Sequence, residues 1–128
     1  MSNHSHTSQS PLIIAHRGES SEAPENTMSA IKLAWESGAD GVEIDVHLTK
    51  DNQIVVIHNS STKSISGKRF RIKSSTLENL KSLNIGRTIG KKYYSERIPT
   101  LNEVLLTVPP GKYIFIEIKC GLEIIPYL

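Results

Sequence analysis

The chain of 128 residues has one cysteine, few aromatic residues and no hydrophobic run long enough to cross a membrane. A single cysteine, Cys120, excludes an internal disulfide framework and is typical of a reducing compartment. The first ten residues are polar and lack the apolar core of a signal peptide. The 15 basic and 13 acidic residues nearly balance, so no overall field favours nucleic acid or a membrane. We therefore expect a cytoplasmic protein with a disordered tail at 1–10 and one domain at 11–128.

Short apolar runs alternate with amphipathic segments along the chain. The apolar runs predict strands at about 12–15, 41–49, 54–57 and 112–119. One helix is expected after residues 24–27, with Asn26 or Thr27 as its cap and a stop at Gly38. Ser75 and Glu78 have capping-box spacing, and so do Thr100 and Glu103, which predicts two more helices. The polar, basic stretch 59–74 is expected to be an ordered or mobile surface loop. This alternation favours an α/β fold.

The pairing of the second and third predicted strands has two possible geometries. The turn at 50–53 favours a hairpin, and a turn centred on Asp51 and Asn52 would place Asp45 opposite His58. A parallel arrangement would also bring both residues to one end, but its connection here would be unusually short. We favour the hairpin.

The second predicted strand carries two carboxylates on one face. Because side chains alternate along a strand, Glu43 and Asp45 point one way while the intervening valines and isoleucine point the other. Two carboxylates are costly to bury without partners, so they need a cation. The last strand repeats this pattern with Glu117 and Lys119. The strands and strand ends therefore offer three carboxylates, two histidines and two cations: Glu43, Asp45, Glu117, His16, His58, Arg17 and Lys119.

Several motifs in order and spacing resemble the glycerophosphodiester phosphodiesterase family. They are His16-Arg17-Gly18, Pro24-Glu25-Asn26-Thr27, Glu43-Ile44-Asp45, Thr49-Lys50-Asp51, His58, Ile98-Pro99-Thr100-Leu101-Asn102-Glu103 and Glu117-Ile118-Lys119. The resemblance implies a (β/α)8 TIM-type barrel, of which this chain would form about the first four strands with their helices. It also implies hydrolysis of a glycerophosphodiester to glycerol 3-phosphate and an alcohol.

The resemblance assigns a divalent metal to the three carboxylates. Glu43, Asp45 and Glu117 would hold Mg²⁺ or Ca²⁺, because hard cations prefer oxygen ligands. The metal would act as a Lewis acid on a phosphoryl oxygen.

The same resemblance assigns roles to the other charged groups. His16 and His58 would be the general acid and base, and the sequence does not say which is which. Arg17 and Lys119 would bind the phosphate. For Lys119 a simple ion pair with Glu117 is the alternative.

The chain departs from the family's pattern in one residue and in length. Asn59 stands where the family usually has Asp after its second histidine, so the size and one acceptor oxygen are kept while the charge is lost. A complete barrel takes about 250 residues. Half a barrel has open sheet edges, which favour self-association.

Two alternative functions are considered beside the phosphodiesterase. One is a truncated, non-catalytic remnant that binds metal or a phosphorylated ligand. The other is a different barrel hydrolase such as an amidohydrolase, which predicts a His-x-His strand end; His16-Arg17-Gly18 does not fit that pattern.

Overall fold

One four-stranded sheet organises the chain, which was studied as a computed structural model that describes residues 11–86 and 89–128. The expected tail at 1–10 lies outside the described residues. In chain order the elements are β1 (Ile14–His16), α1 (Met28–Glu36), β2 (Gly41–Leu48), β3 (Ile54–Val56), α2 (Lys63–Ser66), η2 (Ile72–Ser74), α3 (Leu77–Lys81), η3 (Lys91–Tyr93), α4 (Leu101–Leu105), β4 (Tyr113–Ile118) and η4 (Leu122–Tyr127).

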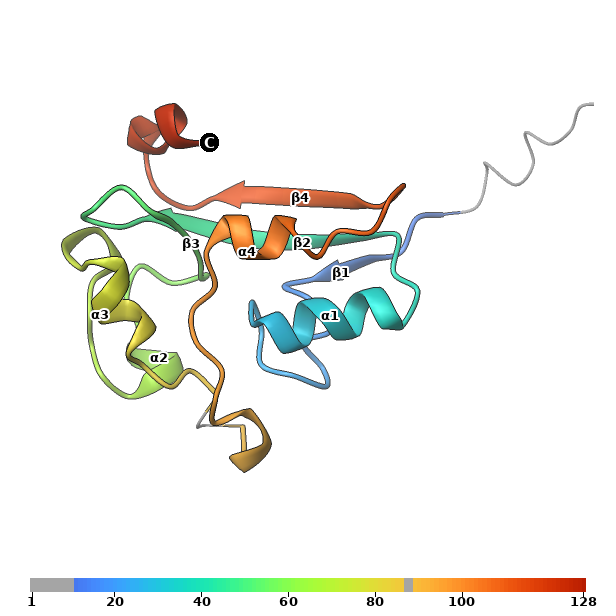
Figure 1. Cartoon of the computed structure of the whole chain (residues 1–128), viewed down its shortest axis with the longest axis horizontal. Coiled ribbons are helices and arrows are strands. Elements are labelled where there is room, and N and C mark those ends of the chain that lie inside the picture. The colour runs from blue at the N-terminus through green and yellow to red at the C-terminus, as the bar shows by residue number, and fades with distance from the viewer. Residues whose placement is uncertain (1–10, 87–88) are drawn as a thin grey trace, which may run out of the picture.

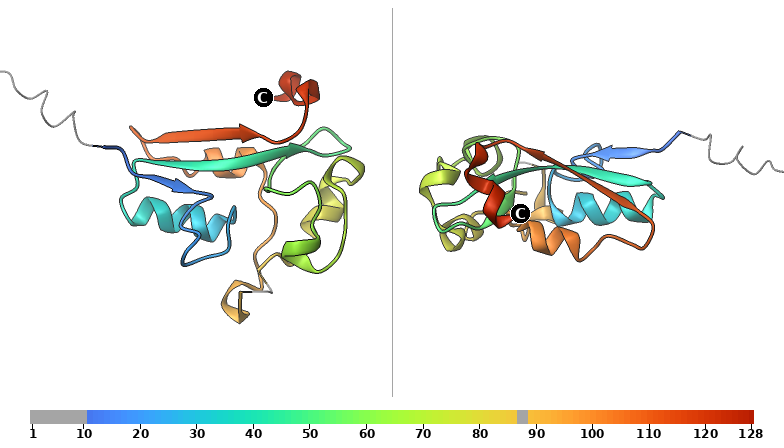
Figure 2. Two further views of the ribbon diagram at one scale, coloured as in Figure 1. Left: turned by 180° about the vertical axis from the view of Figure 1, so that it is seen from behind. Right: turned by 90° about the horizontal axis from the view of Figure 1, so that it is seen from above.

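β2 is the central strand of the sheet. It pairs in parallel with β1 on one side and with β4 on the other, while β3 pairs with it in the antiparallel direction. The helices α1 and α4 lie on one face of these strands (Figures 1 and 2). Three parallel strands connected through segments that carry helices are the beginning of a β/α barrel, and β3 is an antiparallel addition beyond β1.

The main core lies between β2 and the two helices. Val42, Ile44 and Val46 are fully buried against residues of α1 and α4, among them Ile31 and Val104. The opposite face of β2 carries Glu43 and Asp45, as the alternation of the sequence predicts. The apolar face of one strand therefore holds the layers together, and its polar face is left for chemistry.

Two of the three predicted helix caps are confirmed. Thr27 accepts from the Ala30 amide, and Thr100 forms a complete capping box with Glu103. The expected cap at Ser75 is wrong by one residue, because Thr76 accepts from the Asn79 amide instead. The Ser75 hydroxyl donates to the carbonyl of Arg71, which commits it to the preceding turn.

The expected hairpin is present, but its register differs by one residue. Val46 is opposite Val56, and the Ile57 amide donates to the Asp45 carbonyl, so Ile57 rather than His58 lies opposite Asp45. The Thr49 amide donates to the Gln53 carbonyl, which leaves a three-residue loop in place of a two-residue turn.

The polar stretch 59–74, expected to be an ordered or mobile surface loop, is ordered and carries two short helical elements. It contains α2 and η2, and Ile72 within it is buried. Ile72 packs against Val55, Leu80 and Ile98 in a second, smaller core. The segment from His58 to α3, which we call the His58 lobe, packs against β3 through this second core.

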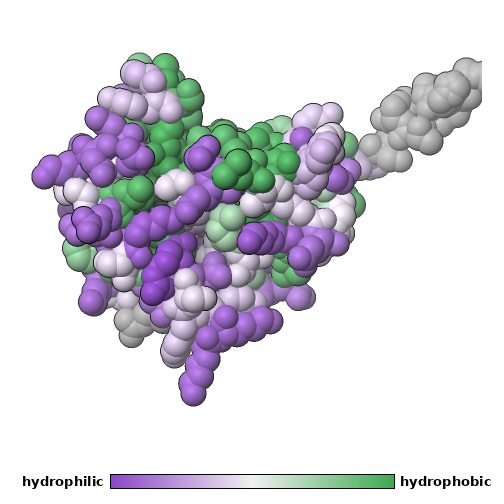
Figure 3. Space-filling view, viewed as in Figure 1, coloured by the Kyte–Doolittle hydropathy of each residue, from purple (hydrophilic) through white to green (hydrophobic). Residues whose placement is uncertain are grey.

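The far edge of the sheet exposes apolar side chains. Figure 3 shows them as a green area along the top of the molecule, over β4 and η4. Exposed residues there are Tyr113, Phe115, Ile116, Ile118, Leu122, Ile125, Tyr127 and Leu128. Among the residues described, no helix is long and apolar enough to span a membrane.

Candidate active site

The register of the sheet brings the three predicted carboxylates together. Asp45 of β2 is directly opposite Glu117 of β4, and Glu43 lies two residues earlier on the same face of β2. One oxygen from each of the three carboxylates lies within 4.8 Å of the others. This cluster is the kind of all-oxygen ligand set that Mg²⁺ and Ca²⁺ prefer.

Asp45 is the buried member of the cluster, with no solvent exposure. Its Oδ2 lies 3.1 Å from Arg17 Nε and accepts a hydrogen bond of 3.1 Å from Asn26 Nδ2. Its Oδ1 is buried and has no hydrogen-bond partner within residues 11–86 and 89–128. A buried acceptor without a partner is costly, and a cation held by the three carboxylates would satisfy it.

Glu43 lies beside both acidic neighbours and one of the predicted histidines. Burial raises the pKa of Glu43, and the negative charges of Asp45 and Glu117 raise it further, while His16 acts in the opposite direction. His16 is directly opposite Glu43 in the β1–β2 pairing, and its Nε2 lies 3.6 Å from Glu43 Oε1. Burial and the two acidic neighbours together thus outweigh the effect of His16 on this carboxyl.

The turn after β1 directs Arg17 back over the sheet. Arg17 and Asn26 both have positive φ, a conformation in which Asn is enriched. Two backbone bonds close the turn, from the Arg17 amide to the Glu43 carbonyl and from the Asn26 amide to the Arg17 carbonyl. Gly18 also has positive φ, and a Cβ there would lie 2.7 Å from the backbone of Ala30, so only glycine fits beneath α1.

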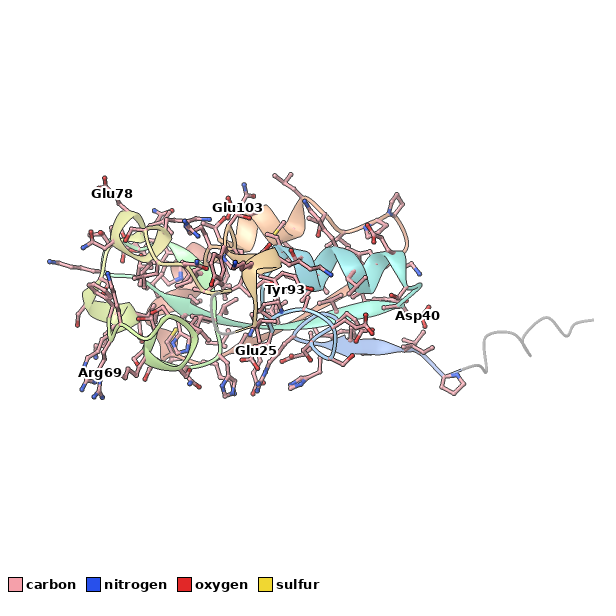
Figure 4. All side chains as sticks on the ribbon, turned by 90° about the horizontal axis from the view of Figure 1, so that it is seen from below. Glu25, Asp40, Arg69, Glu78, Tyr93 and Glu103 are labelled. Atoms are coloured by element: carbon pink, nitrogen blue, oxygen red, sulfur yellow. The ribbon has the colours of Figure 1, made fainter. Side chains whose placement is uncertain are left out.

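Arg17 has a second acidic partner in this loop. Its Nη1 lies 3.1 Å from Oε1 of Glu25, a residue of the loop that connects β1 to α1. Glu25 is labelled in Figure 4. The guanidinium is therefore held between the buried Asp45 and the more exposed Glu25. Its side chain keeps about a fifth of its surface accessible.

His58 follows β3 and is hydrogen-bonded at its ring and at its backbone. Its Nδ1 lies 2.8 Å from Asn59 Oδ1, and Asn59 Nδ2 donates to the Ser64 hydroxyl. The backbone carbonyl of His58 lies 3.0 Å from Nε2 of His47, which is nearly buried. Burial lowers the pKa of His47, which favours its neutral ring.

A cavity of about 370 Å³ lies between the loop after β1 and the His58 lobe. It is lined by Arg17, Pro24, Glu25, His58, Asn59, Ser64, Ile65, Ile85 and Ile89. The cavity is polar at Arg17 and His58 and apolar at its isoleucines. It offers space for a small group beside Arg17, which contacts Asp45 of the cluster.

Lys119 lies just beyond the end of β4. Its Nζ is 3.2 Å from Glu117 Oε2, so the alternative ion pair is present in this structure. Glu117 is half exposed, and the pair faces the open side of the sheet. This position also leaves Lys119 available to an anion at the cluster.

The structure joins most of the predicted site residues through contacts. His16 contacts Glu43, Arg17 contacts Asp45, Lys119 contacts Glu117, and His58 lines the same cavity as Arg17. Their catalytic and ligand roles stay predictions.

Two supporting residues have contacts that the sequence pattern does not indicate. Asn26, one of the two residues expected as a helix cap, bonds to Asp45, and His47, near the end of β2, bonds to the backbone carbonyl of His58. The signal for His47 is its place on the face of Glu43 and Asp45.

Comparisons with known proteins agree with this geometry. The model of the glycerophosphoryl diester phosphodiesterase family matches residues 16–126. A glycerophosphodiester phosphodiesterase of Caldanaerobacter subterraneus subsp. tengcongensis is 47% identical over 117 residues, which cover 90% of this chain and 48% of that protein.

Solved structures show the same likeness. A phosphodiesterase of Oleispira antarctica in complex with the product sn-glycerol-3-phosphate has a TM-score of 0.81 and 37% identity, over 88% of this chain and 46% of that one. A glycerophosphodiester phosphodiesterase of Thermotoga maritima has a TM-score of 0.74 and 39% identity, with the same coverage. These neighbours are TIM-barrel proteins, which confirms the partial barrel. The chain spans about half the length of the relatives it matches.

Proposed function

Because the chain belongs to the glycerophosphoryl diester phosphodiesterase family, we propose that it carries the metal-binding and acid–base groups for hydrolysis of glycerophosphodiesters to glycerol 3-phosphate and an alcohol. The observation that carries this proposal is the cluster of Glu43, Asp45 and Glu117, in which Oδ1 of Asp45 has no hydrogen-bond partner among the described residues. The cluster lies beside His16 and Arg17, which are the groups that acid–base and phosphate chemistry require.

A divalent cation fits these residues. Three carboxylates cluster there, the pKa of Glu43 is raised, and Asp45 Oδ1 has no hydrogen-bond partner among the described residues. Each of these favours a bound cation in addition to Arg17 and Lys119, which already pair with Asp45 and Glu117. Glu43, Asp45 and Glu117 would hold the ion, either Mg²⁺ or Ca²⁺. When bound, it supplies Lewis-acid stabilisation of charge on a phosphoryl oxygen.

Two cationic side chains would bind the phosphate. Arg17 presents a planar guanidinium that is already fixed by Asp45 and Glu25, so little entropy is lost when its remaining donors bind an oxygen. Lys119 would exchange part of its contact with Glu117 for a phosphate oxygen. Both charges then offset the negative charge that grows in the transition state.

The two histidines would move the protons. The side-chain nitrogen Nδ2 of Asn59 donates to the Ser64 hydroxyl, so its side-chain oxygen Oδ1 faces His58 and accepts a hydrogen bond from Nδ1 of that ring. This arrangement leaves Nε2 of His58 as the atom that takes or gives a proton. One ring takes a proton from water and the other gives one to the departing alcohol oxygen, and imidazole is suited to both tasks near neutral pH. The cavity beside His58 would hold one of the two groups esterified to the phosphate.

The direct test is release of glycerol 3-phosphate from glycerophosphocholine, followed by a coupled enzyme assay of this chain fused to the second half of a relative, as described in the next paragraph. Activity should need Mg²⁺ or Ca²⁺ and disappear with a chelator. His16→Ala and His58→Ala should each lower turnover by about 10²- to 10⁴-fold. Activity that survives chelation would exclude the metal, and a variant with wild-type turnover would remove that histidine from the mechanism.

A chimera tests the site in a closed barrel. The chain would be fused to the second half of the Caldanaerobacter relative, which extends well beyond the matched region. An active chimera that Glu43→Gln inactivates would show that this chain supplies a competent site. The unmodified relative is the positive control.

The second candidate, metal or phosphate-ligand binding without turnover, is favoured by one observation. The chain spans about half of its relatives and leaves the β4 side of the sheet exposed. We therefore expect little or no turnover from the 128 residues alone. Calorimetric binding of Mg²⁺ or Ca²⁺ without hydrolysis would support this candidate, and hydrolysis by the isolated chain would refute it.

A further inference from the structure

His47 is a nearly buried histidine on the polar face of β2 that the proposed mechanism does not use. It follows Glu43 and Asp45 on the same face of β2. It lies opposite Val55 of β3 in the antiparallel pairing, three residues before His58. Its Nε2 lies 3.0 Å from the backbone carbonyl of His58. Since a carbonyl oxygen only accepts, Nε2 of His47 must be the donor.

The contact comes at a point where the ladder between the two strands stops. β3 ends at Val56, and the Ile57 amide makes the next bond to β2, at the Asp45 carbonyl. The chain then leaves the sheet at His58. The His47 side chain therefore makes a contact between β2 and the chain just beyond the ladder, at the point where the chain departs.

The direction of departure determines where the imidazole of His58 lies. Asn59 holds Nδ1 of that ring, but Asn59 is itself exposed and attached to the same loop. Its hydrogen bond fixes the ring relative to the loop. The bond from His47 instead ties the His58 backbone to a side chain of the central strand, which carries Glu43 and Asp45.

We propose that His47 is a positioning residue: its Nε2–H anchors the backbone of His58 to β2 and so sets the imidazole of His58 relative to the carboxylate cluster. The inference rests on the proposed function for its catalytic consequence and on geometry alone for its structural consequence. A loss of placement by about 1 Å can cost about 100-fold in rate.

The test compares His47→Leu with His47→Gln in the full chain. Leucine removes the donor, whereas the amide nitrogen of glutamine can reach a position close to that of Nε2. Two-bond ¹⁵N–¹H spectra of the histidine-labelled chain report the tautomer and order of the His58 ring. We expect one well-defined ring environment in the wild type and in His47→Gln, and averaged or broadened signals in His47→Leu.

Turnover of the chimera described above should follow the spectra. In His47→Leu we expect kcat to fall by about 10- to 100-fold with KM changed less than about twofold, and we expect His47→Gln to recover most of the loss. Val104→Ala is the matched control, because it removes buried volume from the core beneath α4 without a contact to His58. It should lower the melting temperature and leave the His58 signals unchanged.

The outcomes separate the two proposals. Unchanged His58 signals in a folded His47→Leu chain would overturn the positioning role. Signals that change equally in Val104→Ala would also overturn it, because the effect would then be general loosening. If the His58 signals change in His47→Leu but neither the chain nor the chimera hydrolyses the substrate, the positioning role stands and the proposed function is refuted.

Discussion

Replacing Glu43 by glutamine should stabilise the metal-free chain while removing its response to a divalent cation. One oxygen of Glu43 lies within 4.8 Å of oxygens of both Asp45 and Glu117. At 4.8 Å two unit charges repel by about 0.9 kcal/mol in a water-like dielectric. The substitution removes two such pairs, roughly 2 kcal/mol, and loses the attraction to His16. We expect a net gain of about 1 kcal/mol in the free energy of unfolding.

The assay is thermal unfolding by circular dichroism, with chelator and with excess Mg²⁺ or Ca²⁺. A gain of about 1 kcal/mol corresponds to a rise of roughly 3–6 °C in the melting temperature for a chain of this size. A cation at 100 times its dissociation constant should stabilise the wild type by about 2.7 kcal/mol. Glu36→Gln, at the exposed end of α1, is the control and should show neither effect.

The pH dependence of the melting temperature tests the charge of Glu43 in a second way. Because the pKa of Glu43 is raised in the folded state, the folded chain binds more protons than the unfolded chain just above the ordinary glutamate pKa of 4.5. In chelator, this residue should therefore make stability fall as pH rises from about 4.5 through its folded pKa, and Glu43→Gln should abolish that part of the slope. A lower melting temperature for Glu43→Gln in chelator, or an undiminished response to the cation, would refute the reasoning.

Three other changes test separate features. Asn59→Asp places a charged acceptor about where an oxygen now lies 2.8 Å from Nδ1 of His58, and should strengthen that hydrogen bond and move the Nδ1–H proton resonance downfield; a resonance that does not move would contradict the contact. Thr100→Ala removes the capping box of α4 and should cost about 1 kcal/mol in urea unfolding, whereas Thr100→Ser should not. The chain should self-associate in sedimentation velocity through its open β4 side, and Leu122→Lys, at an 83% exposed position, should weaken this association; a monomer at all concentrations would count against it.

Much of the site could be predicted because one strand has a clear period of two. The alternation in β2 identifies both the buried face and the carboxylates Glu43 and Asp45 from the order of the residues alone. The same logic in β4 identifies Glu117, and the parallel register then places it opposite Asp45. Where an arrangement follows from alternation along strands, a sequence is sufficient.

The remaining contacts depend on features that a local pattern does not contain. The hairpin register depends on whether its loop has two or three residues, and the bonds from Thr49 decide that only in the folded turn. Asn26 contacts Asp45 because its backbone adopts a positive φ, which has no sequence signature beyond the residue type. The bond from His47 to His58 likewise depends on where the chain leaves the sheet.

The two faces of β2 explain how the chain can carry an unbalanced acidic cluster and still fold. Val42, Ile44 and Val46 are each fully buried on one face, and burial of such a side chain contributes about 1.5–3 kcal/mol. The two repulsive pairs that Glu43 makes on the other face cost roughly 2 kcal/mol together, so the apolar face outweighs them. The partners of this apolar face are side chains of α1 and α4, which are present within the chain itself. If the proposed function holds, a cation and an anionic ligand would balance the polar face, and changes there should alter binding much more than folding.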